Sequence, residues 1–190
     1  MVDIHVYDCG SKAMVSSKDR LLENLANYIN CPQSALRINK TDNGKPELTG
    51  VEYHGGFSIS HSRNLLVQAF SSIGVIGIDV EYKNHRRNYL KLAKRYFHTQ
   101  EYNYIRRLDE NSSMQWFYKL WTAKEAVCKA EGGRLWYYLR DNYLVEDNTN
   151  RKTMINLIKG LTIMQYQHIA GFSLTIATEE KPDRVRFIYA

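Results

Sequence analysis

The spacing of apolar residues in the first half of the chain predicts short strands around one helix. A strand is expected over residues 4–7, and the helix is indicated by four apolar residues at helical spacing, Leu21, Leu22, Leu25 and Ile29. Residues 57–62 and 65–71 form two apolar segments around a tight turn, and an apolar run from 73 to 78 follows them. Short segments at this spacing are typical of an antiparallel meander, so we expect neighbouring strands here.

The second half of the chain repeats this order, with two helices before the last strands. The first helix has an apolar stripe formed by Tyr89, Leu92, Ala93, Tyr96 and Phe97. The second helix has an apolar side formed by Met114, Phe117, Tyr118, Trp121 and Cys128. Gly132 and Gly133 end that helix. Residues 163–166 and 171–177 predict a closing hairpin, and residues 184–188 predict a last strand.

The repeated order predicts an α+β fold made of two similar lobes. Each lobe would hold a small antiparallel sheet with packed helices, and a polar hinge after Tyr82 would join the lobes. We therefore expect an N-terminal lobe over residues 1–82 and a C-terminal lobe over residues 83–190. Two lobes in one chain remove the need for a dimer, so we expect a monomer.

Composition and charge narrow the functional classes. The chain has 190 residues, 44% of them hydrophobic, and a formal net charge of +6, which indicates a folded protein with an anionic partner. That partner is a nucleic acid, a phosphorylated small molecule or an acidic protein, although positive charge alone also serves solubility. No apolar stretch approaches the ~20 residues of a membrane span, and no signal peptide is visible, so we expect no membrane association. A cytoplasmic location fits the three cysteines, which lack metal-like spacing: Cys9, Cys31 and Cys128.

Two acids at the end of the apolar run 73–78 are candidate metal ligands. Strand side chains alternate between faces, so Asp79 and Glu81 point the same way. Two carboxylates this close repel each other and resist burial unless a cation lies between them. Hard oxygen ligands suit Mg²⁺ or Mn²⁺. The alternative is an exposed strand end with two solvated acids.

Glu125 lies on the apolar side of the second long helix. Trp121 precedes it by four residues and Cys128 follows it by three, so Glu125 should face inward and needs a partner. Lys129 could pair with it along the helix as an ordinary surface ion pair. In the functional interpretation Glu125 is instead a third metal ligand beside Asp79 and Glu81, and Lys129 neutralises phosphate charge.

Two further polar segments could bind phosphate. Ser60 and His61 come at the end of a buried strand, and Lys45 projects from a turn between Gly44 and Pro46. Each has an ordinary explanation, because a histidine in a hairpin and a lysine in a turn are usually solvated.

Five segments, in this order, resemble the 4′-phosphopantetheinyl transferases, in particular their larger, surfactin-synthetase-activating type. They are Gly44-Lys45-Pro46, the strand 57–62, the acid segment 77–81, residues 93–97 with Glu101 and Tyr102, and Trp121-Thr122-Ala123-Lys124-Glu125 through Lys129. The resemblance covers the chain from about Leu21 onwards. Family members carry an early basic segment that grips the adenosine end, and it has no clear counterpart before Leu21.

The resemblance implies a pseudo-twofold α+β fold with coenzyme A bound between two lobes. It implies Mg²⁺, with Mn²⁺ as an alternative, on Asp79, Glu81 and Glu125. Lys45, Ser60 and His61 would hold the 3′-phosphate of coenzyme A, Lys129 would contact the pyrophosphate, and Glu101 would be a further acid at the reacting centre.

The implied reaction transfers 4′-phosphopantetheine to a serine of an acyl or peptidyl carrier protein and releases adenosine 3′,5′-bisphosphate. The carrier could serve fatty acid, polyketide or nonribosomal peptide synthesis, and the base could be Glu125, Glu101 or a metal-bound water. An acidic carrier would dock near a basic helix face formed by Arg86, Arg87, Lys91, Lys94 and Arg95. The alternative for this basic face is an ordinary solvated helix face. The alternatives for the function are a metal-dependent nuclease and a non-catalytic binding module. We expect no nucleic-acid partner, because a nuclease leaves Glu125 and Lys129 unexplained.

Overall fold

The first four-stranded sheet contains both ends of the chain. The computed structural model describes residues 1–10, 17–72, 74–146 and 152–190. In spatial order the strands are β12 (Val185–Tyr189), β1 (Val2–Asp8), β5 (Leu65–Ser71) and β4 (Gly56–Ser62). β1 pairs in parallel with β12, and the other neighbours are antiparallel. Helix α1 (Ser17–Ile29) packs Leu21 and Leu25 against Phe57 and Phe70 of this sheet, because its apolar residues recur on one side.

The second four-stranded sheet is antiparallel throughout and carries the longest helix. Its strands, in spatial order, are β6 (Ile76–Tyr82), β11 (Phe172–Thr178), β10 (Leu161–Tyr166) and β9 (Leu157–Ile158). Helix α4 (Glu110–Glu131) packs on this sheet and comes very near β6 at Gly77. A Cβ atom at Gly77 would lie 1.9 Å from the Ala126 carbonyl oxygen, so glycine is needed for this approach.

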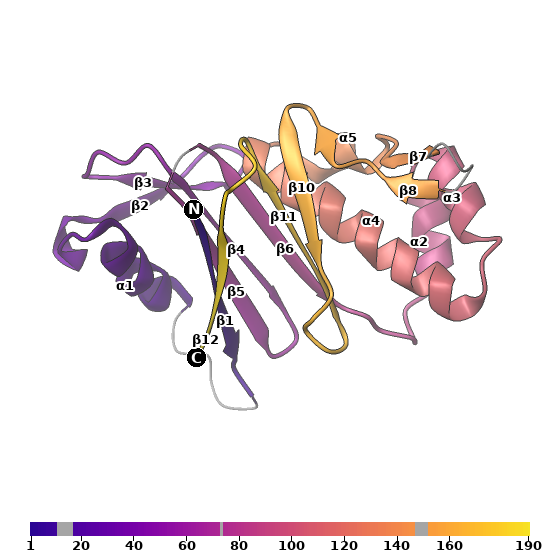
Figure 1. Ribbon diagram of the computed structural model, residues 1–190, viewed down its shortest axis with the longest axis horizontal. Coiled ribbons are helices and arrows are strands. Elements are labelled where there is room, and N and C mark those ends of the chain that lie inside the picture. The colour runs from indigo at the N-terminus through magenta and orange to yellow at the C-terminus, as the bar shows by residue number, and fades with distance from the viewer. Residues whose placement is uncertain (11–16, 73, 147–151) are drawn as a thin grey trace.

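Short elements complete the two ends of the molecule. They are η1 (Gln33–Ala35), β2 (Arg37–Lys40), β3 (Pro46–Thr49), α2 (Tyr89–Tyr96), α3 (Thr99–Ile105), α5 (Leu135–Leu139), β7 (Leu144–Glu146) and β8 (Lys152–Met154). Figure 1 shows α1, β2 and β3 at one end, α2 and α3 at the other, and the two larger sheets between them. Stacked rings of Phe97 and Phe117, 5.2 Å apart, help to hold α4 against the end of α2.

Serine side chains join the facing edges of the two sheets. Three backbone N–H groups of β6 donate to hydroxyls of β4: Ile78 to Ser58 at 3.1 Å, Val80 to Ser60 at 3.3 Å and Tyr82 to Ser62 at 3.0 Å. These serines alternate along β4 and therefore share the strand face that meets β6. We call them the serine ladder. It brings the acid-bearing strand of one sheet against the edge of the other sheet.

The α+β class with small sheets and packed helices is confirmed. The hairpin predicted over residues 57–62 and 65–71 is formed by β4 and β5, and the long predicted helix is α4. No helix in the described part of the chain is long and apolar enough to cross a membrane.

The predicted meander is wrong in its third strand. β6 pairs with the distant β11, while β5 already has β1 and β4 as its neighbours. The short spacing along the sequence favoured pairing of β6 with a strand next to it in the chain. In the structure β6 instead meets β4 through the hydroxyls of the serine ladder, without backbone pairing between the two strands. Ile73, the first residue of the predicted apolar run, lies outside the described residues.

The expected lobe boundary at Tyr82 does not coincide with a boundary between sheets. β6 precedes Tyr82 along the chain but belongs to the second sheet, and β12 returns from the C-terminus to the first sheet. Division into lobes over residues 1–82 and 83–190 and their pseudo-twofold relation stay predictions.

Candidate active site

Three acids from two elements converge beside the junction of the sheets. Asp79, Glu81 and Glu125 each offer a carboxylate oxygen, and these oxygens lie within 4.8 Å of one another. The two strand acids share a face of β6 because one residue separates them. Glu125 joins them because α4 contacts β6 at Gly77 through the neighbouring Ala126. The structure thus brings together the residues that the sequence predicted as metal ligands.

Two cations face these three acids. Lys129 Nζ donates to Asp79 Oδ1 at 2.7 Å and to Ser60 Oγ at 3.0 Å. The Arg87 guanidinium lies 4.0 Å from Glu81 Oε2. Lys129 therefore reaches across to the strand, and the ordinary Glu125–Lys129 surface pair is not seen among the described ion pairs.

Burial and mutual repulsion disfavour ionisation of Glu81 and Glu125. Asp79 is only 2% exposed, and within the described residues its Oδ2 has no hydrogen-bond partner. The pKa of Glu81 is raised by burial and by the negative charge of Asp79. The pKa of Glu125 is raised to about 7, first by burial and then by Asp79. A further cation would stabilise the ionised cluster.

The donor set fits a divalent metal ion. Carboxylate oxygens are the ligands that Mg²⁺ and Mn²⁺ prefer, and a buried carboxylate oxygen without a hydrogen-bond partner is an available ligand atom. Asp79, Glu81 and Glu125 are the residues that would hold the ion.

The serine ladder also orients the strand acids. Ser60 Oγ donates to Asp79 Oδ1 at 2.8 Å, and Ser62 Oγ donates to Glu81 Oε2 at 3.1 Å. Ser60 also accepts from Val80 and Lys129, so its one donor and both acceptor positions are in use. Sequence reasoning gave Ser62 no separate role. The alternation of serines at 58, 60 and 62, matched to acids at 79 and 81, was the available signal.

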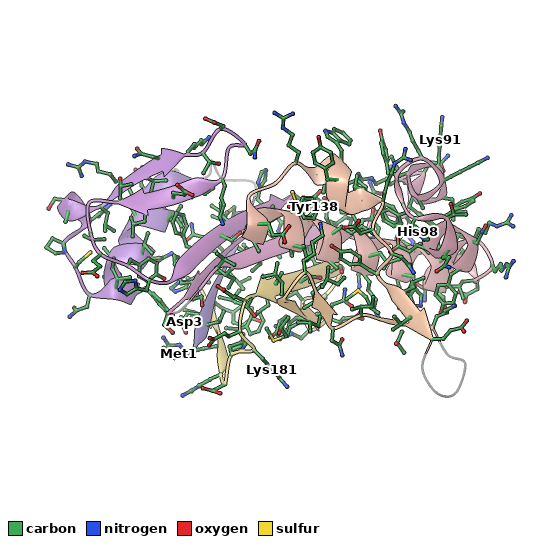
Figure 2. The ribbon with its side chains drawn as sticks, turned by 90° about the horizontal axis from the view of Figure 1, so that it is seen from above. Met1, Asp3, Lys91, His98, Tyr138 and Lys181 are labelled. Atoms are coloured by element: carbon green, nitrogen blue, oxygen red, sulfur yellow. The ribbon has the colours of Figure 1, made fainter. Side chains whose placement is uncertain are left out.

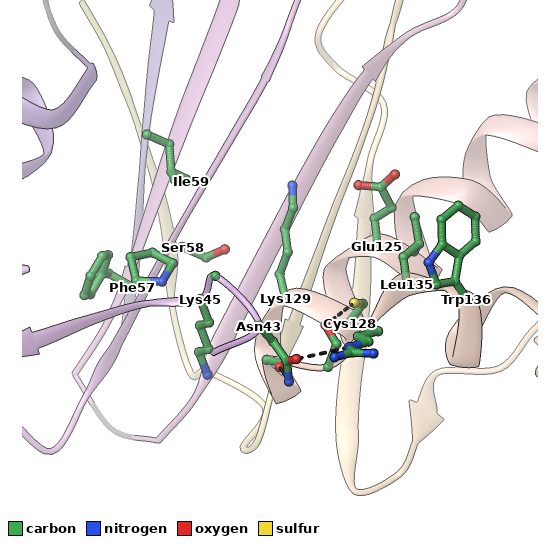
Figure 3. Close-up of a pocket in the computed structure, with 15 residues that line it drawn as sticks. Asn43, Lys45, Phe57, Ser58, Ile59, Glu125, Cys128, Lys129, Leu135 and Trp136 are labelled. Atoms are coloured by element: carbon green, nitrogen blue, oxygen red, sulfur yellow. Dashed lines mark hydrogen bonds between the residues drawn. The ribbon is translucent and has the colours of Figure 1, made fainter. Parts of the chain in front are cut away.

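A cavity of about 500 Å³ opens beside the acids (Figure 3). Glu125 and Lys129 line it from α4, and Phe57 lines it from β4. Figure 3 shows the side chains of Glu125 and Lys129 pointing upward from α4, while Lys45 lies to their left with its nitrogen pointing down. The cavity is therefore bounded by β4 of the first sheet and by α4, which packs on the second sheet, and it reaches the acid cluster at Glu125.

Two predicted phosphate contacts have other surroundings. Lys45 lines the cavity, but its Nζ donates to the Ala130 carbonyl at the end of α4, at 2.6 Å. Burial lowers the pKa of this lysine. His61 is exposed on β4 and is absent from the described lining of the cavity. Phosphate binding by Lys45, Ser60 and His61 stays a prediction.

Glu101 lies outside the acid cluster. Its side chain is completely buried, and its Oε1 is 3.0 Å from Lys124 Nζ and accepts from Tyr143 N at 2.8 Å. Its Oε2 accepts from the backbone N–H of His98 at 3.2 Å, closing a capping box on α3. Both oxygens are therefore occupied by structural contacts, and a role at the reacting centre stays a prediction.

Comparison with known proteins assigns the family. Residues 75–177, which include β6, α4 and β11, match the model of the 4′-phosphopantetheinyl transferase superfamily. The chain belongs to this superfamily. The match contains all three clustered acids, so the family assignment and the geometry concern the same part of the chain.

Three relatives show the extent of the similarity within this superfamily. The 4′-phosphopantetheinyl transferase gsp of Aneurinibacillus migulanus is 31% identical over 151 residues, covering 78% of this chain and 60% of that protein. HetI of Nostoc is 34% identical over 110 residues, covering 57% and 46%. Sfp of Bacillus subtilis is 35% identical over 100 residues, covering 53% and 43%. The chain thus spans about half the length of the curated relatives it matches.

Proposed function

We propose that this protein transfers 4′-phosphopantetheine from coenzyme A to a serine of a carrier protein, with Mg²⁺ or Mn²⁺ bound to Asp79, Glu81 and Glu125. The observation that carries the proposal is the convergence of these three acids, with Asp79 Oδ2 unpartnered among the described residues, beside a cavity of about 500 Å³ that Glu125 lines. That volume falls within the range of small-molecule sites. The superfamily match of the same residues supports it.

The bond changes require alignment and charge neutralisation. The carrier serine oxygen forms a bond to the phosphorus that bears pantetheine, and the P–O bond to the other phosphate breaks. The leaving electron pair departs with adenosine 3′,5′-bisphosphate. A bound divalent ion would neutralise pyrophosphate charge. Lys129 lines the cavity beside Asp79, so its ammonium is placed for the same pyrophosphate.

Glu125 is the acid best placed to take the serine proton. Its carboxylate lines the cavity, whereas Asp79 and Glu81 are not among the described lining residues. Glu101, a candidate alongside Glu125 and a metal-bound water, is completely buried with both oxygens bonded. The serine proton would therefore go to a Glu125 oxygen.

The carrier protein docks on the basic face of α2 and an adjoining groove. Arg86, Lys91, Lys94 and Arg95 are exposed, and Figure 2 shows Lys91 projecting outward from the molecule, whereas Arg87 is half-buried against Glu81 and Trp121. A groove of about 270 Å³ beside this face is lined by Arg95, Tyr96, Trp136, Leu139 and Arg140. Trp136 also lines the main cavity and is 64% exposed, so the groove adjoins the reacting centre. Basic rims with an aromatic floor suit an acidic carrier.

We also propose that the enzyme acts as a monomer in the cytoplasm. The three acids and the cavity come from one chain, which supports action as a monomer. Cys9, Cys31 and Cys128 are free thiols, which supports a reducing cytoplasm. The carrier could belong to fatty acid, polyketide or nonribosomal peptide synthesis, and a panel of carriers would distinguish these.

The experiment is intact mass spectrometry of apo carrier proteins after incubation with this protein, coenzyme A and Mg²⁺. A carrier should gain the mass of one phosphopantetheine group. Asp79→Asn and Glu125→Gln should each lower the rate roughly a hundredfold or more, while Glu180→Gln, an exposed acid outside the cluster, should keep it. No mass gain on any carrier would reject the transferase, and cleavage of DNA together with that result would favour the nuclease.

A further inference from the structure

The turn between β2 and β3 reaches across the cavity to the end of α4. Lys45 Nζ donates to the Ala130 carbonyl at 2.6 Å, and Asn43 Nδ2 donates to the Gly132 carbonyl at 3.1 Å. These partners are 85 and 89 residues apart along the chain, so the contacts tie an N-terminal hairpin to the C-terminal half. We call Asn43 and Lys45 the helix-end clamp.

The end of α4 is built to receive this clamp. The last carbonyls of a helix lack partners within the helix and carry partial negative charge, which favours a lysine there. Gly132 ends α4 in the left-handed conformation, with φ of 69°. A Cβ atom at Gly132 would lie 2.8 Å from Lys45 Cδ, so glycine also leaves room for the lysine stem. Stem and ammonium together fit this helix end.

The clamp holds α4 at its C-terminal end, close to where β6 contacts the same helix. A Cβ atom at Gly77 of β6 would lie 2.6 Å from the Ala130 nitrogen, and Lys45 contacts the carbonyl oxygen of the same residue. Ala130 is therefore fixed by β6 and by the hairpin together. Glu125 and Lys129 lie in the last two turns before this point, so their distance from Asp79 depends on it.

A second cation near the end of α4, Arg134, faces the cavity. Arg134 is exposed and lines the cavity, and its Nε donates to Asn43 Oδ1 at 3.4 Å. Among the described residues Asn43 is the one hydrogen-bond partner of the Arg134 side chain, which leaves the two terminal guanidinium nitrogens for a bidentate contact with a phosphate. Coenzyme A carries a pyrophosphate and, separated from it by the ribose, a 3′-phosphate. Lys129 lies beside the acids and Arg134 lies beyond the helix end, so the cavity offers two separate cations to two separate anionic groups.

We propose a division of labour, which rests on the proposed function: Lys45 is a positioning residue that holds α4 and its metal ligand, and Arg134 binds the 3′-phosphate. Lys45 acts through the Ala130 carbonyl on the placement of Glu125. Arg134 supplies the charge that the family resemblance implied for Lys45. Asn43 joins the two roles, because its amide donates to Gly132 and its carbonyl oxygen accepts from Arg134.

The test crosses two variants with two donors, coenzyme A and 3′-dephospho-coenzyme A. Lys45→Met keeps the stem and removes the ammonium, so kcat should fall on the order of tenfold with both donors. Mn²⁺ binding, measured by electron paramagnetic resonance, should weaken as well. Arg134→Gln should raise KM on the order of tenfold for coenzyme A only and leave Mn²⁺ binding unchanged. Lys40→Met, an exposed lysine on the same hairpin, is the matched control.

Opposite patterns would overturn the proposal. A loss in Lys45→Met that is confined to coenzyme A, with Mn²⁺ affinity intact, would make Lys45 the phosphate ligand. Equal effects of Arg134→Gln on both donors would remove its assigned role. Lys45→Arg restores a donor and should recover Mn²⁺ binding, which tests positioning even if Lys45→Met folds poorly. The Mn²⁺ measurement needs no transfer, so a wild-type protein inactive on every carrier would reject the proposed function without deciding on the clamp.

Discussion

Two neighbouring residues of α4, Lys124 and Glu125, serve two very different charged sites. Lys124 Nζ lies 3.0 Å from Glu101 Oε1, both side chains are completely buried, and Lys124 also donates to the Asp141 carbonyl. Every oxygen of Glu101 has a partner. Glu125, about 100° further around the helix, faces two more acids, and Asp79 Oδ2 has no partner among the described residues.

The difference between these sites indicates which one stabilises the fold and which one can bind a ligand. The Lys124–Glu101 pair has equal and opposite charges, no exposure to solvent and complete hydrogen bonding, so it needs no ligand. The acid cluster has more negative charge than Lys129 and Arg87 neutralise, and it opens on a cavity. A cluster with excess negative charge beside a cavity can bind a cation, and the cation can then bind an anionic substrate.

Breaking the sealed pair should give the largest change in stability. Lys124→Met leaves the Glu101 carboxylate buried without its cation, which should lower the free energy of unfolding by roughly 3–5 kcal/mol. Lys129→Met, on the open side, should cost much less because Lys129 is 30% exposed. Urea denaturation measures both. Equal losses for the two lysines would contradict the distinction.

The open site should make the metal-free protein less stable as pH rises. The folded-state pKa of Glu125 is about 7, above its ordinary value of 4.5, so the folded protein holds this proton more tightly than the unfolded chain. The free energy of unfolding should therefore fall on the order of 2 kcal/mol between about pH 4.5 and about pH 7. Glu125→Gln should flatten this fall.

Added Mg²⁺ gives a control for the same pH series. Protons compete with the metal for the carboxylates, so Mg²⁺ should raise Tm more at about pH 8 than at about pH 5. Thermal melts at both pH values measure this difference. A Tm increase of the same size at both pH values would show that the titrating acids do not bind the metal.

Removing a hydrogen bond that orients Glu81 should have a smaller effect on stability and on metal affinity. Ser62→Ala removes the hydroxyl that donates to Glu81 Oε2 and accepts from Tyr82 N, which should cost about 1 kcal/mol of stability and weaken Mn²⁺ binding several-fold. Ser34→Ala, an exposed serine on η1, is the matched control. Unchanged Mn²⁺ affinity in Ser62→Ala would remove the orienting role of the serine ladder.

Charge reversal outside both sites should give the smallest effect. Lys91→Glu with Lys94→Glu should raise KM for an acidic carrier several-fold and leave KM for coenzyme A unchanged, because these residues are exposed on α2 and do not line the cavity. Steady-state kinetics with each substrate varied in turn distinguishes these effects. A similar increase for both substrates would reject the docking face.

Local patterns predicted local structure well, and long-range contacts were harder to foresee. The spacing of Phe117 and Trp121 gave α4, and the spacing of Asp79 and Glu81 gave two acids on one strand face. The pairing of β6 with β11 was missed, because no local pattern identifies a strand partner ninety or more residues away. The same limit hid the partners of Glu101 and Lys45, since Lys124 and Ala130 meet them only in the folded chain.

The central claim is that two strand acids and one helix acid bind a single divalent ion. Electron paramagnetic resonance of a Mn²⁺ titration tests it directly, with wild-type protein, Asp79→Asn, Glu125→Gln and the exposed control Glu180→Gln. The account predicts one tight Mn²⁺ per chain in wild type and in the control, and a large loss of affinity in each of the other two variants. Wild-type affinity in Glu125→Gln would contradict it, because the helix acid would then lie outside the metal site.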